Sequence, residues 1–309
     1  MSKKEFVPEN ILWCMDIDQT LAGGVVRAHL LFYNDELNLG MSPEEIDEAG
    51  KIYPHTFKVP QIKKYKEENK TEFQAARNKI LVSETVNKEF ALIAGADSAL
   101  FFLLATYSKL LTYYTVRPSE IKDLTIEWLD EKHLPHPENV VMCLDPKDKI
   151  KKILIDAKYT NTKPILFDDG LEKLVVACEQ LASDFELMEK QGQVIRDLVA
   201  NKVLINDADF MKQQTEILAR FYDIEPDKNI TTYEQLIHDI EPEKIIMTCE
   251  QLIGDFEFMA EYKEIIQHLV IVGYGFNNVN EFIERGDKIG ISIMHVENWE
   301  VLSYLWQEK

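Results

Sequence analysis

Two aspartates stand one residue apart directly after an apolar segment near the start of the chain. The segment 11–15 is followed by Asp16, Ile17 and Asp18. An ionised carboxylate can attack phosphorus at neutral pH without a neighbouring base, and a second carboxylate can donate and later accept a proton. A turn that begins after Asp16 would let one carboxylate attack while the other transfers the proton. The pair suits phosphoryl transfer, which asks little covalent chemistry of a protein beyond such a nucleophile.

A second acidic pair, Asp168 and Asp169, follows another apolar segment later in the chain. Carboxylates that face a phosphate repel it unless a cation lies between them. Oxygen ligands of this kind suit Mg²⁺, which keeps several waters and also binds phosphate oxygens. Thr115 ends a further apolar segment and offers a hydroxyl and its backbone amide to a phosphate oxygen. These residues together predict a magnesium-dependent phosphate site.

A run of lysines could offset negative charge on the phosphate and on the nucleophile. The run comprises Lys147, Lys149, Lys151 and Lys152. We expect Lys149 to have this role, because the buried stripe of its helix would then consist of Ile150, Ile153 and Leu154. Lys147 is the alternative.

The chemically active residues follow short apolar segments that alternate with helical patterns. We expect strands at 11–15, 110–115, 140–144 and 164–167, and helices at 99–109, at 119–132 and from about 147 onward. Strands that alternate with helices predict a parallel sheet covered on both faces. Ligands of such sheets bind at the carboxyl ends of the strands, where Asp16, Thr115 and Asp168 are expected to lie.

The order of these segments resembles the four motifs of the haloacid dehalogenase (HAD) superfamily. The sequence WCMDIDQTL is close to the first motif, LLTYYTVRP is similar to the second, and FDDG resembles the double-aspartate form of the fourth. A lysine at the start of a helix corresponds to the third. Family members that cleave carbon–halogen bonds lack the second aspartate of the first motif, so Asp18 implies phosphate esters as substrates.

The resemblance also implies a role for each residue. Asp16 is then the nucleophile and Asp18 the general acid and base. The expected catalytic set is Asp16, Asp18, Thr115 and Lys149. The expected substrate-binding residues are Thr115, Arg117 and Lys147. The expected Mg²⁺ ligands are Asp16, Asp18, Asp168 and Asp169, with Asp18 acting through its backbone carbonyl.

The expected fold is an α/β, three-layer, Rossmann-like parallel sheet with a helical cap inserted after the first strand. Residues 1–20 and 96–170 form the expected HAD-like core, and residues 286–309, with a strand pattern at 288–296, are a candidate for completing it. Residues 21–95 form the expected cap. Candidate substrate contacts in the cap are His29, Tyr33, His55 and Phe57, although ordinary helix packing is the favoured interpretation.

Residues 171–285 are expected to form an additional helical region with a two-copy repeat. Residues 172–188 match residues 243–259 at an offset of 71, with ten of 17 positions identical. The HAD resemblance does not explain this repeat. Paired helices often present a binding surface, so the repeat is a candidate site for a protein partner.

The composition narrows the expected partners and location. The chain has 309 residues, 34 of them basic and 54 acidic, for a net charge of −20. Such a surface repels polyanions, so nucleic acid is not an expected partner. No segment approaches the roughly 20 apolar residues of a membrane span. The four cysteines form no CxxC pair, which fits a reducing, cytoplasmic location.

The favoured hypothesis is a magnesium-dependent phosphomonoester hydrolase that acts on a small phosphorylated substrate through an aspartyl-phosphate intermediate. One alternative is a phosphoprotein phosphatase or interaction protein whose repeat region recruits a protein partner. Another is a scaffold that has lost activity, and the complete set of motifs speaks against it.

Overall fold

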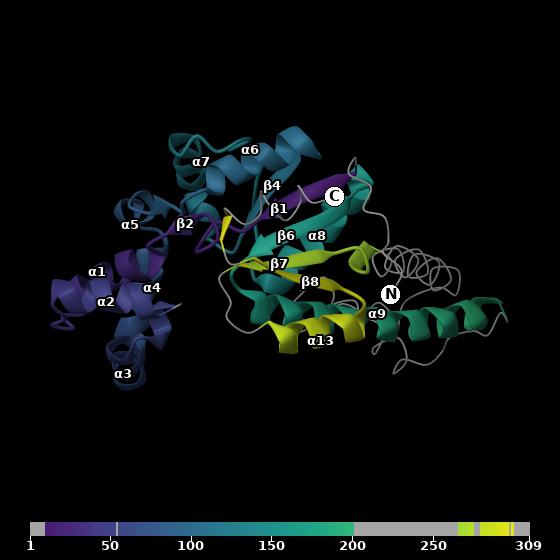
Figure 1. Ribbon diagram of the computed structural model, residues 1–309. Coiled ribbons are helices and arrows are strands. Elements are labelled where there is room, and N and C mark those ends of the chain that lie inside the picture. The colour runs from purple at the N-terminus through teal and green to yellow at the C-terminus, as the bar shows by residue number, and fades with distance from the viewer. Residues whose placement is uncertain (1–9, 54, 201–264, 275–278, 297, 300–309) are drawn as a thin grey trace. The chain divides into compact units, whose positions relative to one another are not determined.

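The computed structural model describes residues 10–53, 55–200, 265–274, 279–296 and 298–299 (Figure 1). The chain divides into two compact units, one of Met1–Val175 with His268–Lys309 and the other of Val176–Gln267. The first unit contains the sheet. Residues 243–259, the second copy of the repeat, lie outside the described residues. None of the described helices combines the length and apolar character needed to cross a bilayer.

A six-stranded parallel sheet forms the centre of the first unit, in the order β5-β4-β1-β6-β7-β8 (Figure 1). The strands are β1 (Ile11–Met15), β4 (Leu110–Thr115), β5 (Val140–Met142), β6 (Lys163–Asp168), β7 (Val270–Tyr274) and β8 (Ser292–Val296). Every residue of β1 is buried. A strand covered on both faces has an uninterrupted apolar sequence, which is why the sequence predicts it. The expected parallel α/β fold is confirmed.

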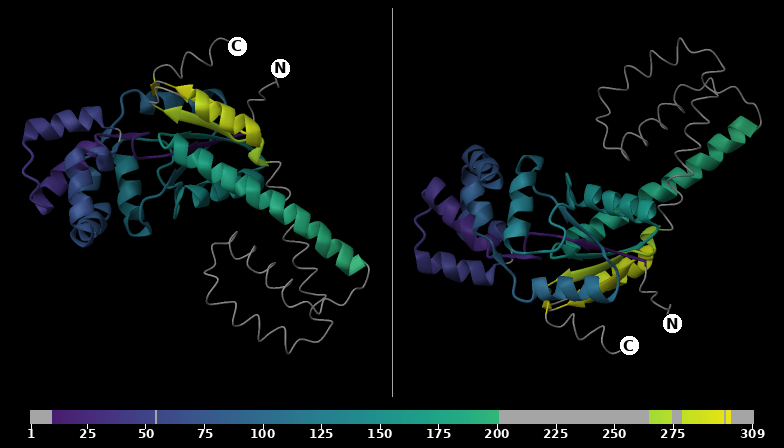
Figure 2. Two further views of the ribbon diagram at one scale, coloured as in Figure 1. Left: turned by 90° about the horizontal axis from the view of Figure 1, so that it is seen from below. Right: turned by 90° about the horizontal axis from the view of Figure 1, so that it is seen from above.

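Helices cover the sheet on both sides (Figure 2). They are α6 (Ala96–Thr106), η2 (Ser119–Ile121), α7 (Lys122–Glu131), α8 (Pro146–Thr160), α13 (Asn280–Ile289) and the start of α9 (Leu171–Ala200). Helix α8 packs on β1, β4 and β6. It begins at a strong cap, where the Asp145 side chain accepts a hydrogen bond from the Asp148 amide at 2.8 Å, with Pro146 in the first turn. Its stripe of Ile150, Ile153 and Leu154 is buried, as predicted.

The segment between β2 (Ala22–Gly23) and β3 (Ala91–Leu92) is mainly helical. Its helices are α1 (Val25–Glu36), α2 (Pro43–Ile52), η1 (Thr56–Lys58), α3 (Pro60–Glu68), α4 (Lys70–Leu81) and α5 (Glu84–Lys88). The short strands β2 and β3 pair antiparallel, so the chain enters and leaves this segment at one place. Tyr33 stacks on Phe73 with ring centroids 5.3 Å apart, and Phe57 meets the same ring edge-on at 5.9 Å. Tyr33 and Phe57 therefore pack among the helices.

The last two strands of the sheet differ from the sequence prediction. The sequence pattern predicts that Val270–Tyr274 lies inside a helical region, whereas the structure forms β7 there, paired with β6 and β8. A short apolar run fits a buried helix or a buried strand equally well, and the neighbouring repeat favoured the helix. The strand expected at 288–296 is found as β8, which is shorter because α13 extends to Ile289.

Candidate active site

The chain turns directly after β1, as expected from the sequence. The amide of Ala22 donates to the carbonyl of Ile17 at 2.7 Å. Gln19 has a φ of 63°, a left-handed conformation that is uncommon for glutamine and is found in tight turns and at functional sites. Because of this turn, Asp16 and Asp18 both line one cavity.

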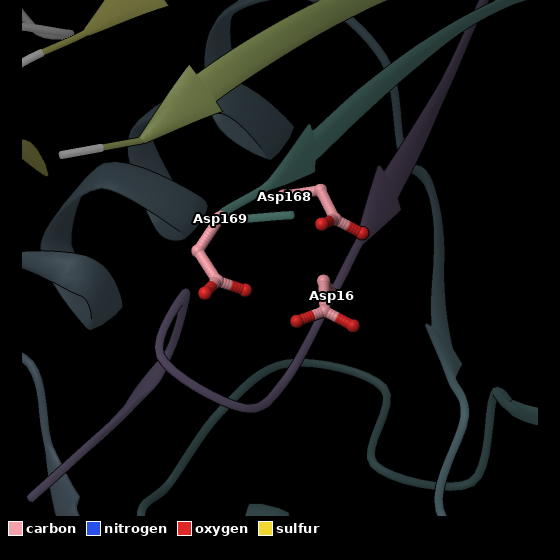
Figure 3. Close-up of side chains that lie close together, drawn as sticks. All are labelled: Asp16, Asp168 and Asp169. Atoms are coloured by element: carbon pink, nitrogen blue, oxygen red, sulfur yellow. The ribbon is translucent and has the colours of Figure 1, made fainter. Parts of the chain in front are cut away.

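Three carboxylates meet at the carboxyl edge of the sheet (Figure 3). Asp16 follows β1, Asp168 is the last residue of β6, and Asp169 comes next in the chain. One carboxylate oxygen of each lies within 4.8 Å of the other two. The strands β1 and β6 are neighbours in the sheet, so segments about 150 residues apart in the sequence supply one cluster.

A single buried lysine contacts two of the three carboxylates. Lys149 Nζ donates to Asp16 Oδ1 at 2.5 Å and to Asp168 Oδ2 at 2.7 Å. Its side chain is only 3% exposed, and α8 places it above the ends of β1 and β6. The structure thus brings Lys149 into the cluster, while Lys147, the alternative, is not among the residues that line the cavity.

The three carboxylates lie close enough to disfavour one another's ionised forms, and one ammonium offsets only part of this effect. Burial raises the pKa of Asp16 to about 7. Repulsion from Asp168 and Asp18 also raises this pKa, whereas Lys149 lowers it. Burial also raises the pKa of Asp169 to about 9, again with repulsion from Asp16 and Asp168. A hard divalent cation prefers carboxylate oxygens and would supply the missing positive charge. The donor set therefore fits Mg²⁺.

Thr20 connects the two acidic segments. Its hydroxyl donates to Asp16 Oδ2 at 3.3 Å and accepts from the Asp169 amide at 3.0 Å. Its own carbonyl accepts from Trp299 Nε1 at 2.8 Å, and the residue is fully buried. Thr20 was not among the site residues predicted from sequence, although its position four residues after Asp16 was the available signal.

Asp18 is held by an arginine that was expected, on sequence grounds, to bind the substrate. Arg117 Nε donates to Asp18 Oδ2 at 3.0 Å and Nη2 donates to Asp18 Oδ1 at 2.6 Å. Arg117 Nη1 also donates to Thr125 Oγ1 at 3.3 Å, and the guanidinium lies 5.5 Å from the Phe90 ring centroid. The structure therefore shows Arg117 engaged by Asp18. Although burial acts in the opposite direction, Arg117 lowers the pKa of Asp18 below its usual value.

One cavity of about 300 Å³ unites these groups. Its walls include Thr115, the buried last residue of β4, whose hydroxyl accepts from the Arg117 amide at 3.3 Å. Three further residues also line it: Gln19, His55 and Lys173. His55 was a candidate substrate contact on sequence grounds, but Gln19 and Lys173 carried no signal there, because their place in the cavity depends on the folded chain.

Comparison with known proteins yields matches among solved structures. No protein-family model and no curated protein sequence matches the chain. Among solved structures, it is similar to a HAD family hydrolase from Deinococcus radiodurans with bound phosphate and sodium (12% identity, TM-score 0.35, covering 54% of this chain and 75% of that one). A haloacid dehalogenase-like hydrolase from Streptococcus pneumoniae also matches (14% identity, TM-score 0.37, covering 56% and 81%).

A third match spans nearly the whole chain. It is a conserved haloacid dehalogenase-like protein of unknown function from Agrobacterium tumefaciens, with 8% identity, a TM-score of 0.41, and coverage of 97% of this chain and 98% of that one. At these identities and scores the matches say nothing about activity. The assignment of the fold rests on the parallel sheet and on the motif residues that it brings together. The chain has a six-stranded parallel α/β sheet, and the residues whose sequence resembles the haloacid dehalogenase motifs lie at the carboxyl edge of that sheet.

Proposed function

We propose that the protein is a magnesium-dependent hydrolase of small phosphate monoesters that works through an aspartyl-phosphate on Asp16. The observation that carries this proposal is the position of the Asp16 carboxylate. It lies at the end of the buried central strand, is bound by Lys149 and Thr20, and lines a cavity that Asp18 and Thr115 also line.

The first step forms a bond between an Asp16 carboxylate oxygen and phosphorus and breaks the bond from phosphorus to the leaving oxygen. Lys149 and Thr20 fix the carboxylate, so little reorientation is needed before attack. Lys149 also offsets negative charge that develops in the transition state. Thr115 supplies a hydroxyl donor at the cavity wall for a phosphate oxygen.

The second step returns Asp16 to its free form. Asp18 accepts a proton from a water molecule that attacks the phosphorus of the aspartyl-phosphate, and inorganic phosphate leaves. Asp18 has by then given its proton to the leaving oxygen, and the lowered pKa that Arg117 causes favours the ionised form that acts as the base in this step. The proton that it gains is the one it delivers to the leaving oxygen of the next substrate.

The residues that would hold Mg²⁺ are Asp16, Asp168 and Asp169, with the backbone carbonyl of Asp18 as the ligand that the resemblance adds. When bound, the cation would neutralise charge on the phosphoryl oxygens and on the carboxylates. The cavity of about 300 Å³ is at the lower end of the range for small-molecule sites. Its size favours a small ester.

An assay with a generic aryl phosphate tests the proposal. We expect Mg²⁺-dependent turnover by the wild type, and a loss of about 10⁴-fold or more in kcat for Asp16→Asn, as for other single nucleophile deletions. Asp47→Asn, at an exposed position paired with Arg27, is the matched control and should keep wild-type turnover. Borohydride trapping during turnover should reduce the acyl phosphate and yield homoserine at position 16, detected by peptide mass spectrometry. Wild-type turnover by Asp16→Asn would refute the proposal.

A further inference from the structure

A hydrogen bond joins the turn after β1 to the helical segment within the lining of the cavity. Gln19 Nε2 lies 3.2 Å from His55 Nδ1, and both residues line the cavity. Burial, together with nearby Lys173 and Lys58, lowers the pKa of His55 below its usual value although Glu172 acts in the opposite direction, so the ring is neutral at pH 7. With Nδ1 accepting the amide hydrogen, the neutral ring carries its proton on Nε2 and can donate it to a ligand.

Lys173 adds a positive charge to the cavity and is close enough to His55 to lower its pKa. It lies in the first turn of α9, within the first unit, and lines the cavity with Gln19 and His55. The other two cations of the cavity, Lys149 and Arg117, are each bound to aspartates. Across the part of the chain that the structure describes, Lys173 forms no ion pair.

Apart from the Asp18–Arg117 ion pair, the polar residues that line the cavity fall into two groups. One is the aspartate cluster with Lys149, which serves the phosphoryl group. The other consists of Lys173 and two neutral side chains, Gln19 and His55. Lys173 offers an ammonium that forms no ion pair with any described residue, and the two neutral side chains offer hydrogen-bond donors. In a protein with a net charge of −20, such a cavity-lining lysine is a local exception that attracts anions.

We propose that Lys173, Gln19 and His55 form a subsite that binds a second anionic group, carried by the leaving group of the phosphate ester. This inference rests on the proposed function and narrows its substrate class. The preferred substrate is a small phosphate monoester with a carboxylate or similar anion on its leaving group. An ester with a neutral or cationic group at that position binds more weakly.

Binding to a chemically inert variant tests the subsite separately from catalysis. The probes are three propyl phosphates that carry a terminal carboxylate, carboxamide or ammonium. Their dissociation constants are measured by calorimetry with Asp16→Asn in the presence of Mg²⁺. We expect the carboxylate to bind about fivefold more tightly than the carboxamide, the size typical of a partly exposed charge pair, and the ammonium to bind most weakly.

Changes at the lysine identify its contribution. Adding Lys173→Gln to the Asp16→Asn variant should remove the preference for carboxylate, while Lys173→Arg should keep it. Lys58→Gln is the matched control, because Lys58 also acts on His55 but is not among the residues that line the cavity. It should leave the preference unchanged.

The outcomes separate the subsite from the proposed function. Equal binding of the three probes, binding of none of them, or a preference that survives Lys173→Gln overturns the subsite. A preference for the carboxylate that Lys173→Gln abolishes supports the subsite even if the wild type hydrolyses none of the probes, in which case the proposed phosphatase activity is the part that fails.

Discussion

Arg117 and Asp18 form a forked ion pair, although 99 residues separate them in the sequence. The Arg117 side chain is only 4% exposed, while that of Asp18 is 36% exposed and lines the cavity. The arginine is itself fixed by Thr125 and by the Phe90 ring. Arg117 therefore fixes the position of the Asp18 carboxylate, which is expected to exchange protons with substrate and water.

Arg117→Lys should lower kcat more than it changes KM. A lysine keeps the charge but cannot reproduce the fork of two parallel hydrogen bonds, so the Asp18 carboxylate loses its fixed orientation. We expect a fall in kcat of about 10- to 100-fold, the range found when outer partners of active-site groups are removed. Steady-state kinetics on an aryl phosphate measures it. Arg27→Lys, at a half-exposed pair with Asp47, is the control, and an equal loss there would contradict a specific role for Arg117.

Lys149→Met should abolish turnover and destabilise the protein. It removes the only described cation within hydrogen-bond distance of the buried Asp16 and Asp168 carboxylates. Removing one partner of a buried ion pair typically costs about 3–5 kcal/mol, which urea unfolding without added metal would detect. Lys147→Met is the matched control, since Lys147 is the alternative lysine of the third motif. If Lys147→Met proved the more damaging of the two, the assignment would have to be reversed.

Much of the site could be predicted from sequence because central parallel strands have a distinctive signature. Segments 11–15 and 110–115 are apolar and bounded by polar residues, and the structure forms β1 and β4 at these positions. The carboxyl ends of adjacent parallel strands meet at one edge of the sheet, so the sequence alone was enough to place Asp16, Thr115 and Asp168 together. Lys149 followed from the apolar stripe on its own helix.

Contacts made only by the folded chain could not be predicted. The Arg117–Asp18 pair joins a residue after β4 to the turn after β1, and spacing alone does not indicate which way an arginine points. The contact of Gln19 with His55 depends on how the helical segment packs. Strand β7 was missed for a different reason, because its short apolar run follows a sequence repeat with helical periodicity.

Thr20→Val should impair the site although it changes the shape of the side chain very little. The methyl group cannot donate to Asp16 or accept from the Asp169 amide, so a buried donor loses its partner. We expect a loss of about 1–3 kcal/mol in the free energy of unfolding, together with reduced kcat. Thr20→Ser keeps the hydroxyl and should recover most of the activity. If the valine variant matched the serine variant in kcat, the hydroxyl would have no role in positioning Asp16.

Mg²⁺ should stabilise the folded protein through the aspartate cluster. A ligand that binds only the folded state adds about 2.7 kcal/mol at one hundred times its Kd, which denaturant unfolding with and without Mg²⁺ can measure. Asp169→Asn should weaken this response while leaving the metal-free protein nearly unchanged, because the raised pKa keeps Asp169 protonated near neutral pH. Asp148→Asn, outside the cluster, is the control. A full Mg²⁺ response in Asp169→Asn would argue against this residue as a ligand.

His29 should make the stability of the protein depend on pH between about 6.5 and 4. Burial lowers the pKa of His29 from 6.5 to about 4, with Arg117 adding to the effect and Asp18 opposing it. In the unfolded chain His29 therefore takes up a proton below about pH 6.5. In the folded protein it takes up this proton only near pH 4. Protonation of the unfolded state favours unfolding, so this contribution to stability is complete above pH 6.5 and decreases as the pH falls.

Comparison with His29→Gln isolates the effect of His29 on the free energy of unfolding. The wild type and the variant share the same carboxylates, so their effect cancels in the difference. The difference in free energy of unfolding between wild type and variant should be constant from pH 7 to 8 and should shift against the wild type between pH 6.5 and 4. Urea unfolding at a series of pH values gives that difference. A difference that stays flat across the acidic range would mean that the packing of His29 against Thr56 and Phe90 does not exclude the charged ring.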